Sequence, residues 1–210
     1  MKSQRLMCRV VALLGIGAGV LATPAVAADC PELVGNWPAG DAFVVSVSGP
    51  TAHLGSGSTL VVVNVSNPTT PTIFGETQLP GVVNGIAVSG AYAFVAIDQG
   101  LIVVDVSNPW APIVVGSVGG WLANGVAVSG PYAYVASSSG LRVVDVSNPT
   151  APVEVGSSDT PDQARGVAVS GPYAYVAGWP PLEVLTSCED LLFTDGFESG
   201  DTSAWSATVP

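Results

Sequence analysis

Residues 85–109, GIAVSGAYAFVAIDQGLIVVDVSNP, recur forty residues later as residues 125–149, GVAVSGPYAYVASSSGLRVVDVSNP. A third start, GVAVSGPYAYVAG, begins at Gly166, and a more diverged copy, VVSVSGPTAHLGSGSTLVVVNVSNP, begins at Val44. Self-similarity at a fixed period of about 40 residues is the signature of a repeat architecture. The fold of most of the chain is therefore decided by this repeat.

Each repeat contains four short runs rich in Val, Ile, Leu and Tyr, and Ser-Gly or Ser-Asn-Pro turns separate the runs. In the third repeat the runs are about residues 125–129, 132–137, 141–146 and 153–157. Such runs between turn residues predict consecutive antiparallel strands, and no run has a helical period. Four strands every 40 or 41 residues is the spacing of β-propeller blades. We therefore predict an all-β propeller of four-stranded antiparallel blades.

The predicted blades are residues 44–84, 85–124, 125–165 and 166–188, within a propeller of residues 28–188. The last blade has only three of its strands, whereas a lone segment with the fourth-strand pattern, in residues 31–36, precedes the first blade. Docking of this segment on the last blade would close a ring of four blades and leave no unpaired edge. An eight-bladed ring made from two chains satisfies the same strand count, and a fragment of a larger propeller is a third reading.

The first 27 residues have the pattern of a secretory signal peptide. Lys2, Arg5 and Arg9 precede a short apolar run, and residues 25–27, Ala-Val-Ala, form a small-x-small cleavage site. Glycines interrupt the run, which is shorter than the roughly 20 apolar residues of a membrane span, so no transmembrane anchor is predicted. We expect a secreted, periplasmic or cell-surface protein of a bacterium.

Two cysteines, Cys30 and Cys188, remain after removal of the signal peptide. In the repeat alignment Cys188 takes the place of Ser147 and Cys30 takes the place of Ala151, on the two sides of the turn between the third and fourth strands. Across such a hairpin the Cα atoms fall within the roughly 4.4–6.8 Å that a disulfide needs. An oxidising compartment favours the bond. We predict a Cys30–Cys188 disulfide within one chain. In the eight-bladed alternative the same bond would join two chains. We expect a monomer, with a dimer as the alternative.

The composition excludes several functions. Without the signal peptide the basic residues are Arg142 and Arg165, with no lysine, against sixteen acids, a formal charge of −14. Nucleic-acid binding needs clustered basic residues, and lysine chemistry has no lysine to use. His53, the one histidine, aligns with Phe94 and Tyr134 at a packing position between blades. We therefore predict no nucleic-acid partner, no catalytic residue, no metal site and no cofactor.

Acidic residues recur in two settings. Asp105 and Asp145 stand just before the Ser-Asn-Pro turns, where we expect them to accept hydrogen bonds from nearby backbone amides. Residues 189–210 break the repeat and form an acidic C-terminal tail. The acids of this tail lack the spacing of an EF-hand calcium loop.

The repeat resembles the LVIVD family of bacterial and archaeal secreted β-propeller repeats. The resemblance is carried by residues 100–109, GLIVVDVSNP, and residues 140–149, GLRVVDVSNP, and it extends from about residue 31 to residue 187. It implies an extracytoplasmic propeller, and the family offers no catalytic residues to transfer.

A propeller presents its binding face on the loops that join the fourth strand to the next first strand and the second strand to the third. Exposed aromatic residues on such a scaffold suit contacts with a protein or a glycan, although tryptophans that only cap the channel fit equally well. We therefore predict a non-enzymatic binding module for an unknown protein or glycan, with an extracytoplasmic enzyme acting at the channel mouth as the alternative. The candidate ligand-binding residues are Trp37, Phe43, Asn84, Asp98, Trp121, Asn124, Gln163, Arg165 and Trp179.

Overall fold

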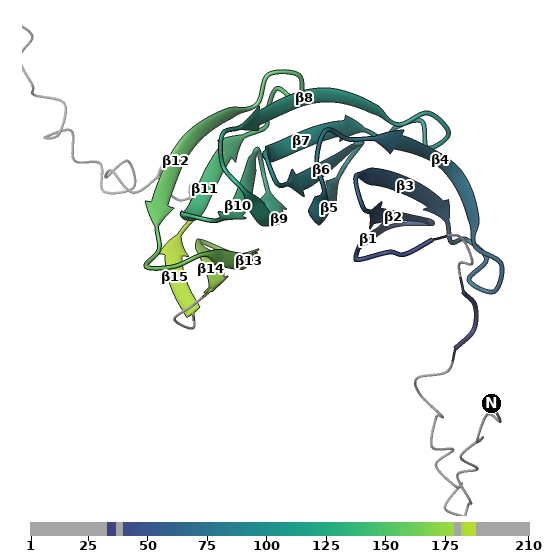
Figure 1. Ribbon diagram of the computed structural model, residues 1–210, viewed down its shortest axis with the longest axis horizontal. Helices are drawn as coiled ribbons and strands as arrows, with labels where there is room; N and C mark the ends of the chain where they lie inside the picture. Colours follow the sequence, from purple (N-terminus) through teal and green to yellow (C-terminus); the bar gives the residue numbers. More distant parts are fainter. Residues whose placement is uncertain (1–32, 37–39, 179–181, 188–210) are drawn as a thin grey trace, which may run out of the picture. The chain divides into compact units, whose positions relative to one another are not determined.

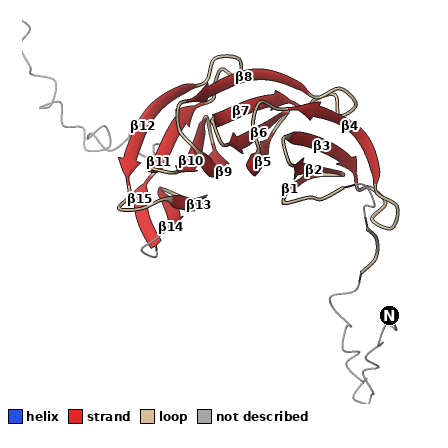
Figure 2. Cartoon of the chain, in the orientation of Figure 1, coloured by secondary structure: helices blue, strands red, loops and turns tan. Residues whose placement is uncertain are grey.

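The computed structural model describes residues 33–36, 40–178 and 182–187. The chain divides into two units, Met1–Leu33 and Val34–Pro210, and every described strand belongs to the second. Among the described residues, strands are joined by turns and loops without any helix (Figure 2). The predicted all-β class is confirmed.

Fifteen strands follow the four repeats (Figure 1). They are β1 (Val44–Ser48), β2 (Thr51–Ser56), β3 (Thr59–Asn64), β4 (Thr72–Gln78), β5 (Val83–Ser89), β6 (Tyr92–Ile97), β7 (Gly100–Asp105), β8 (Ile113–Gly119), β9 (Ala123–Ser129), β10 (Tyr132–Ser137), β11 (Gly140–Asp145), β12 (Val153–Asp159), β13 (Ala164–Ser170), β14 (Tyr173–Gly178) and β15 (Leu182–Thr186). In the third repeat the predicted runs and the observed strands differ by no more than two residues at either end.

The strands form one sheet per repeat. Three sheets contain four strands in chain order, β1–β4, β5–β8 and β9–β12, and the last contains β13–β15. Neighbouring strands pair antiparallel in all four sheets. Each sheet is therefore a propeller-like blade, and we number the blades from first to fourth along the chain.

Closure of the predicted ring is not seen at the fourth blade. Residues 33–36 have no regular secondary structure, and β15 has no strand on its outer side within the described residues. The described part of the chain therefore contains four consecutive blades, the last three-stranded, and no closed sheet.

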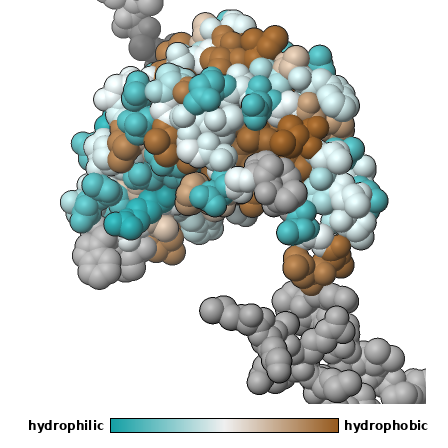
Figure 3. All heavy atoms as spheres, turned by 45° about the vertical axis from the view of Figure 1, so that its right-hand side comes forward, coloured by the Kyte–Doolittle hydropathy of each residue, from teal (hydrophilic) through white to brown (hydrophobic). Residues whose placement is uncertain are grey.

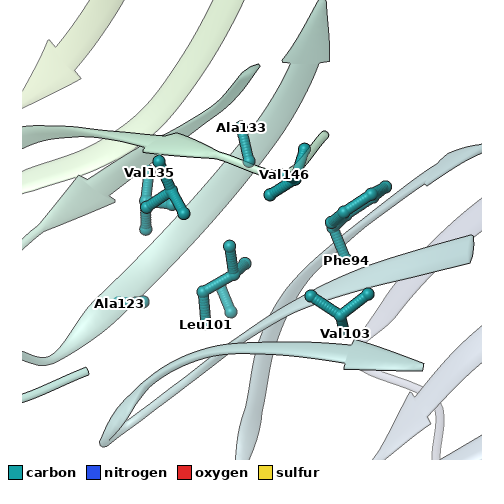
Figure 4. Packing of buried hydrophobic residues seen from close by; sticks show 9 residues of the cluster. Phe94, Leu101, Val103, Ala123, Ala133, Val135 and Val146 are labelled. Atoms are coloured by element: carbon teal, nitrogen blue, oxygen red, sulfur yellow. The ribbon is translucent and has the colours of Figure 1, made fainter. Parts of the chain in front are cut away.

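Apolar cores lie between successive blades. Between the second and third blades, Leu101 and Val103 of β7 pack with Ala133 and Val135 of β10 (Figure 4). Phe94 belongs to the same core, and the equivalent Tyr134, which is fully buried, belongs to the core between the third and fourth blades. The prediction that the aromatic residues of the second strands pack between blades is confirmed at both positions.

Tight turns and bulges adapt these sheets to blade packing. The two-residue loop after β5 begins with Gly90 at a φ of 59°, which suits the first central position of a type II′ hairpin turn. In β8 the pairing leaves Val115 as an extra residue just before Gly116. A Cβ at Gly116 would lie 2.2 Å from the carbonyl oxygen of Pro149, in the Ser-Asn-Pro turn of the next blade. The glycine is therefore required where the outer strand of one blade lies against a turn of the next.

The Ser-Asn-Pro turns are closed by the side chain that precedes them. The backbone amide of Ser107 donates to the carboxylate of Asp105 at 2.9 Å, and the amide of Ser147 donates to Asp145 at 2.8 Å. Hydrogen bonds from Ser107 and Ser147 lower the pKa values of the two aspartates. The predicted structural role of Asp105 and Asp145 is confirmed, because a carboxylate fixed by its own turn serves local structure.

Candidate functional site at the loop end of the blades

The loops from fourth to first strands and from second to third strands lie together, and we call this side the loop end. The backbone amide of Val82 donates to Asp98 Oδ1 at 3.2 Å, and Gln99 Nε2 donates to the carbonyl of Pro80 at 3.3 Å. In the third blade the amide of Ser138 donates to the carbonyl of Leu122 at 3.0 Å. The loop end is thus held by hydrogen bonds between loops, and Asp98 belongs to this framework.

Inner-strand bulges position three of the candidate residues. Asn84, Asn124 and Arg165 are the extra residues at the starts of β5, β9 and β13. Asn84 Nδ2 donates to the carbonyl of Ala123 at 2.9 Å, and Asn124 Nδ2 donates to the carbonyl of Ala164 at 2.7 Å. Both asparagines therefore link one blade to the next.

Trp121 takes part in a polar cluster that the sequence analysis did not anticipate. Its Nε1 donates to Glu154 Oε2 at 2.9 Å, while Arg142 Nη1 lies 3.2 Å from Glu154 Oε1. Arg142 Nη2 also donates to Ser139 Oγ at 2.6 Å. One sequence signal points to this cluster: Arg142 occupies the repeat position where Ile102 is apolar. The indole of Trp121 is partly buried, so it is fixed by packing and by its bond to Glu154.

Two of the candidate residues share a hollow. Gln163 and Arg165, with Asp162 and Gly178, line a volume of about 450 Å³ beside the fourth blade. The Arg165 side chain has no hydrogen bond or ion pair within the described part of the chain. This hollow is therefore lined by a residue with an unengaged cation and by Asp162, whose carboxylate accepts from the backbone amide of Gln163 at 2.6 Å.

Phe43 lies at the other end of the blade series. It is exposed, and it lines a hollow of about 460 Å³ with Gly40, Ala42 and Val45 among its neighbours. The structure thus brings Gln163 and Arg165 together and leaves Phe43, Asp98 and Trp121 in the loops of other blades. Trp37 and Trp179 lie outside the described residues, as do the signal segment, Cys30, Cys188 and the acidic tail.

Sequence comparison connects these blades with a known repeat. The LVIVD repeat matches four consecutive segments, residues 39–78, 80–119, 122–160 and 161–185. The chain belongs to the LVIVD repeat family. The four segments correspond to the four blades, so one LVIVD repeat is one blade. No curated protein sequence matches the chain.

Solved structures with the LVIVD chain's fold include two designed proteins. The computationally designed Ika4 protein superposes with a TM-score of 0.59 at 10% identity, over 74% of this chain and 97% of that one. The computationally designed Ika8 protein gives a TM-score of 0.55 at 10% identity, over 69% of this chain and 45% of that one. At this identity the likeness concerns the fold alone.

His53 is buried between the first two LVIVD blades. Its side chain is 3% exposed, and its Nδ1 has no hydrogen-bond partner in the described structure. Burial lowers the pKa of His53, and this effect exceeds the opposing effect of the Ser46 backbone. The predicted packing position is therefore confirmed for His53. Among the described residues, no group of three or more His, Cys, Asp or Glu side chains could hold a metal ion, and no helix could cross a membrane.

The buried imidazole predicts a pH-dependent stability. Because the folded pKa is lowered from 6.5, His53 contributes stability that is fully present above pH 6.5 and is lost as the pH falls through the folded pKa. His53→Phe introduces the residue that stands at the equivalent position 94. We expect this variant to gain stability relative to the parent as the pH falls from 7.5 to 5, measured by urea unfolding. If the difference in unfolding free energy between His53→Phe and the parent is the same at pH 7.5 and pH 5, then His53 does not cause the pH dependence.

Proposed function

We propose that this LVIVD chain is an extracytoplasmic, non-enzymatic module that binds a protein or glycan partner at the loop end. The observation that carries the proposal is the hollow lined by Asp162, Gln163 and Arg165, which combines a carboxylate, an amide and an unengaged guanidinium. Polar groups of this kind can be satisfied by the hydroxyl groups of a sugar or by the backbone of a peptide. Residue variation supports the same location, because the strands repeat closely while Asp98, Trp121 and Gln163 differ between repeats.

The placement of the titratable groups supports binding over catalysis. His53 is buried between two blades, and Asp105 and Asp145 are bound to turns at the ends of β7 and β11 opposite the loop end. A general base needs to reach a substrate proton within hydrogen-bond distance. These groups are therefore placed for structure, and a binding role uses the loop end without them.

Two parts of the proposal concern residues that lie wholly or partly outside the described structure. The location outside the cytoplasm is supported by the signal-peptide pattern of residues 1–27. Completion of the fourth blade by residues 31–36 is supported by the fourth-strand pattern of that segment and by the edge of β15, which lacks a partner in the described chain. An exposed edge of this kind otherwise invites aggregation.

Glycan and peptide arrays test the binding site. We expect a ligand whose affinity falls about tenfold or more in Arg165→Ala, because a hydrogen bond to a charged group is worth about 1.5–3 kcal/mol. Gln163→Ala should weaken the same ligand less. The control is Trp110→Ala, which removes a side chain that is 66% exposed in a Ser-Asn-Pro turn, away from the loop end.

Loss of binding in Trp110→Ala with full binding in Arg165→Ala would contradict the proposal, because it would place the binding site at the Ser-Asn-Pro turns and not at the loop end. Turnover of a substrate on a hydrolase panel, abolished by a loop-end substitution, would replace the binding module with an enzyme.

A further inference from the structure

The first and fourth blades each leave one apolar face without a neighbouring blade. For every blade we call the side toward the preceding blade its leading face and the side toward the following blade its trailing face. On the leading face of the first blade Val45 and Val47 of β1 are each 62% exposed, whereas Ala52, Val61 and Val63 of the same face are buried. Leu182 and Val184 on the trailing face of the fourth blade are 58% and 52% exposed. Figure 3 shows hydrophobic patches among hydrophilic surface on the side of the molecule that it turns forward.

These two faces are the two halves of an interface that the chain already makes three times. On trailing faces Val62, Val103 and Val143 hold the position of Val184, and each is buried. On leading faces Ile86 and Val88 hold the positions of Val45 and Val47, and both pack into the core between the first two blades. The trailing face of the fourth blade therefore has the shape and chemistry to receive a leading face like that of the first.

Charge also favours a match between these two faces. The chain without its signal segment carries sixteen acids against two arginines, so two copies repel each other over most of their surface. The inner strands of the first blade present Val45, Val47, Ala52 and Leu54 on its leading face, and the one strand acid of that face is Glu76 on the outer strand β4. The trailing face of the fourth blade presents Tyr173, Tyr175, Ala177, Leu182 and Val184, and its described strands carry no acid there. An anionic chain can associate with itself there without bringing carboxylates together.

Arg165 adds a polar contact that is missing from the open face. At the equivalent bulge positions, Asn84 and Asn124 each donate to a carbonyl of the following blade, at Ala123 and Ala164. In the first blade the residue equivalent to these acceptors is Ala42, which lines the hollow beside Phe43. Arg165 on the fourth blade and Ala42 on the first blade are thus the donor and the acceptor of one further link of the same kind.

The N-terminal segment already occupies the place of a preceding blade's fourth strand. A Cβ at Gly35 would lie 2.0 Å from the carbonyl oxygen of Pro68, in the Ser-Asn-Pro turn of the first blade. Gly75 and Gly116 in the fourth strands of the first and second blades make the same contact with the turns of the blades that follow them. Residues 34–36 are therefore positioned beside the first blade as the outer strand of a blade that would precede it.

The contacts between inner strands indicate whether the blade that precedes the first blade is the fourth blade of the same chain or that of a second copy. β1, β5, β9 and β13 contact one another in succession, but β1 and β13 have no comparable contact. Close glycine contacts set this spacing, since a Cβ at Gly85 would lie 2.9 Å from the Cα of Gly125. A ring of four blades needs each blade to turn about twice as far from its neighbour as a ring of eight does. Closure within one chain would therefore require all three packed interfaces to change.

We propose that the chain forms a two-chain propeller of eight blades, in which the first blade of each copy packs on the fourth blade of the other. This inference rests on the proposed completion of the fourth blade by residues 31–36 and assigns that strand to the second copy. Each of the two joints then repeats the internal interface. The Arg165–Ala42 contact uses one of the five N–H donors of the guanidinium and leaves the others for a ligand in the hollow. The two-fold arrangement closes, so it leaves no free blade edge.

The mass of the assembly is the test. Native mass spectrometry and light scattering of the purified protein should give twice the mass of one chain over a wide concentration range. Non-reducing electrophoresis should give a covalent dimer through Cys30 of one copy and Cys188 of the other. A single-chain mass with a Cys30–Cys188 bond inside one chain would overturn the proposal and leave completion of the fourth blade intact. A single-chain mass with rapid amide exchange in β15 would overturn both.

Charge substitutions on the end faces test the joint directly, in a Cys30→Ser/Cys188→Ser background so that no covalent link remains. Val184→Asp and, independently, Val47→Asp should each raise the dimer dissociation constant by about a hundredfold or more, because each buries a carboxylate in an apolar joint. Ile113→Asp is the matched control, since Ile113 is 61% exposed on an outer strand away from both faces. Cooperative thermal unfolding of each variant establishes that it folds. Folded Val47→Asp and Val184→Asp proteins that dimerise like Ile113→Asp would overturn the proposal.

Discussion

Deletion of residues 28–36 is expected to abolish cooperative unfolding of this protein or to cause its aggregation. The deletion removes the segment whose Gly35 lies against the Pro68 turn of the first blade. It also leaves β15, Leu182–Thr186, with unpaired backbone groups along its outer side. The measurement is thermal unfolding by circular dichroism, together with light scattering to detect aggregates.

The deletion also removes Cys30, so a second variant separates the strand from the predicted disulfide. Cys30→Ser/Cys188→Ser retains the segment and cannot form the bond. We expect this variant to unfold cooperatively at a lower temperature, because the chain keeps its strand pairing and loses only a cross-link, typically worth about 2–4 kcal/mol. A deletion variant as stable as the full chain would show that residues 28–36 are a dispensable leader.

Gly116→Ala is expected to lower the free energy of unfolding by about 3 kcal/mol or more. The added methyl group would lie 2.2 Å from the carbonyl oxygen of Pro149 and 2.9 Å from the ring of Pro152, and backbone atoms cannot rotate away as a side chain can. Overpacking of this kind typically costs about 1–3 kcal/mol, and here the third blade must also move away from the second. Urea unfolding measures the change.

Ser117→Ala is the control for that substitution. Ser117 is the next residue on β8 and is exposed, so we expect a change within about 0.5 kcal/mol. Equal stability of Gly116→Ala and Ser117→Ala would mean that the outer strands do not approach the next blade's turn as closely as the structure has them.

The fold could be predicted from the sequence because the repeat constrains every blade in the same way. The nearly continuous apolar runs of β6 and β7 occur again in β10 and β11, and the strands of both pairs are packed on both faces. Whether the blades close into a ring, and with how many blades, could not be predicted, because strand counting is satisfied by one chain or by two. The number of blades that a ring needs depends on the rotation from one blade to the next. Contacts between blades, such as that of Gly85 with Gly125, set this rotation.

The candidate site was only partly predictable for a different reason. Asn84 and Asn124 are polar residues at variable positions, which is what a binding site would also show, but bulges direct their amides to the next blade. The cluster of Trp121, Arg142 and Glu154 joins residues that are 12 to 33 positions apart. Such contacts arise from strand register and blade packing, which the residue pattern alone does not reveal.

Hydrogen exchange in β15 reports directly whether a fourth strand completes the fourth blade. The reference is β11, Gly140–Asp145, the third strand of a complete blade, whose two neighbours β10 and β12 cover both of its edges. If residues 31–36 of either copy pair with β15, the amides of Leu182–Thr186 should exchange as slowly as those of β11. Rapid exchange of every second amide in β15 would mean that its outer edge is open and that no fourth strand completes the blade.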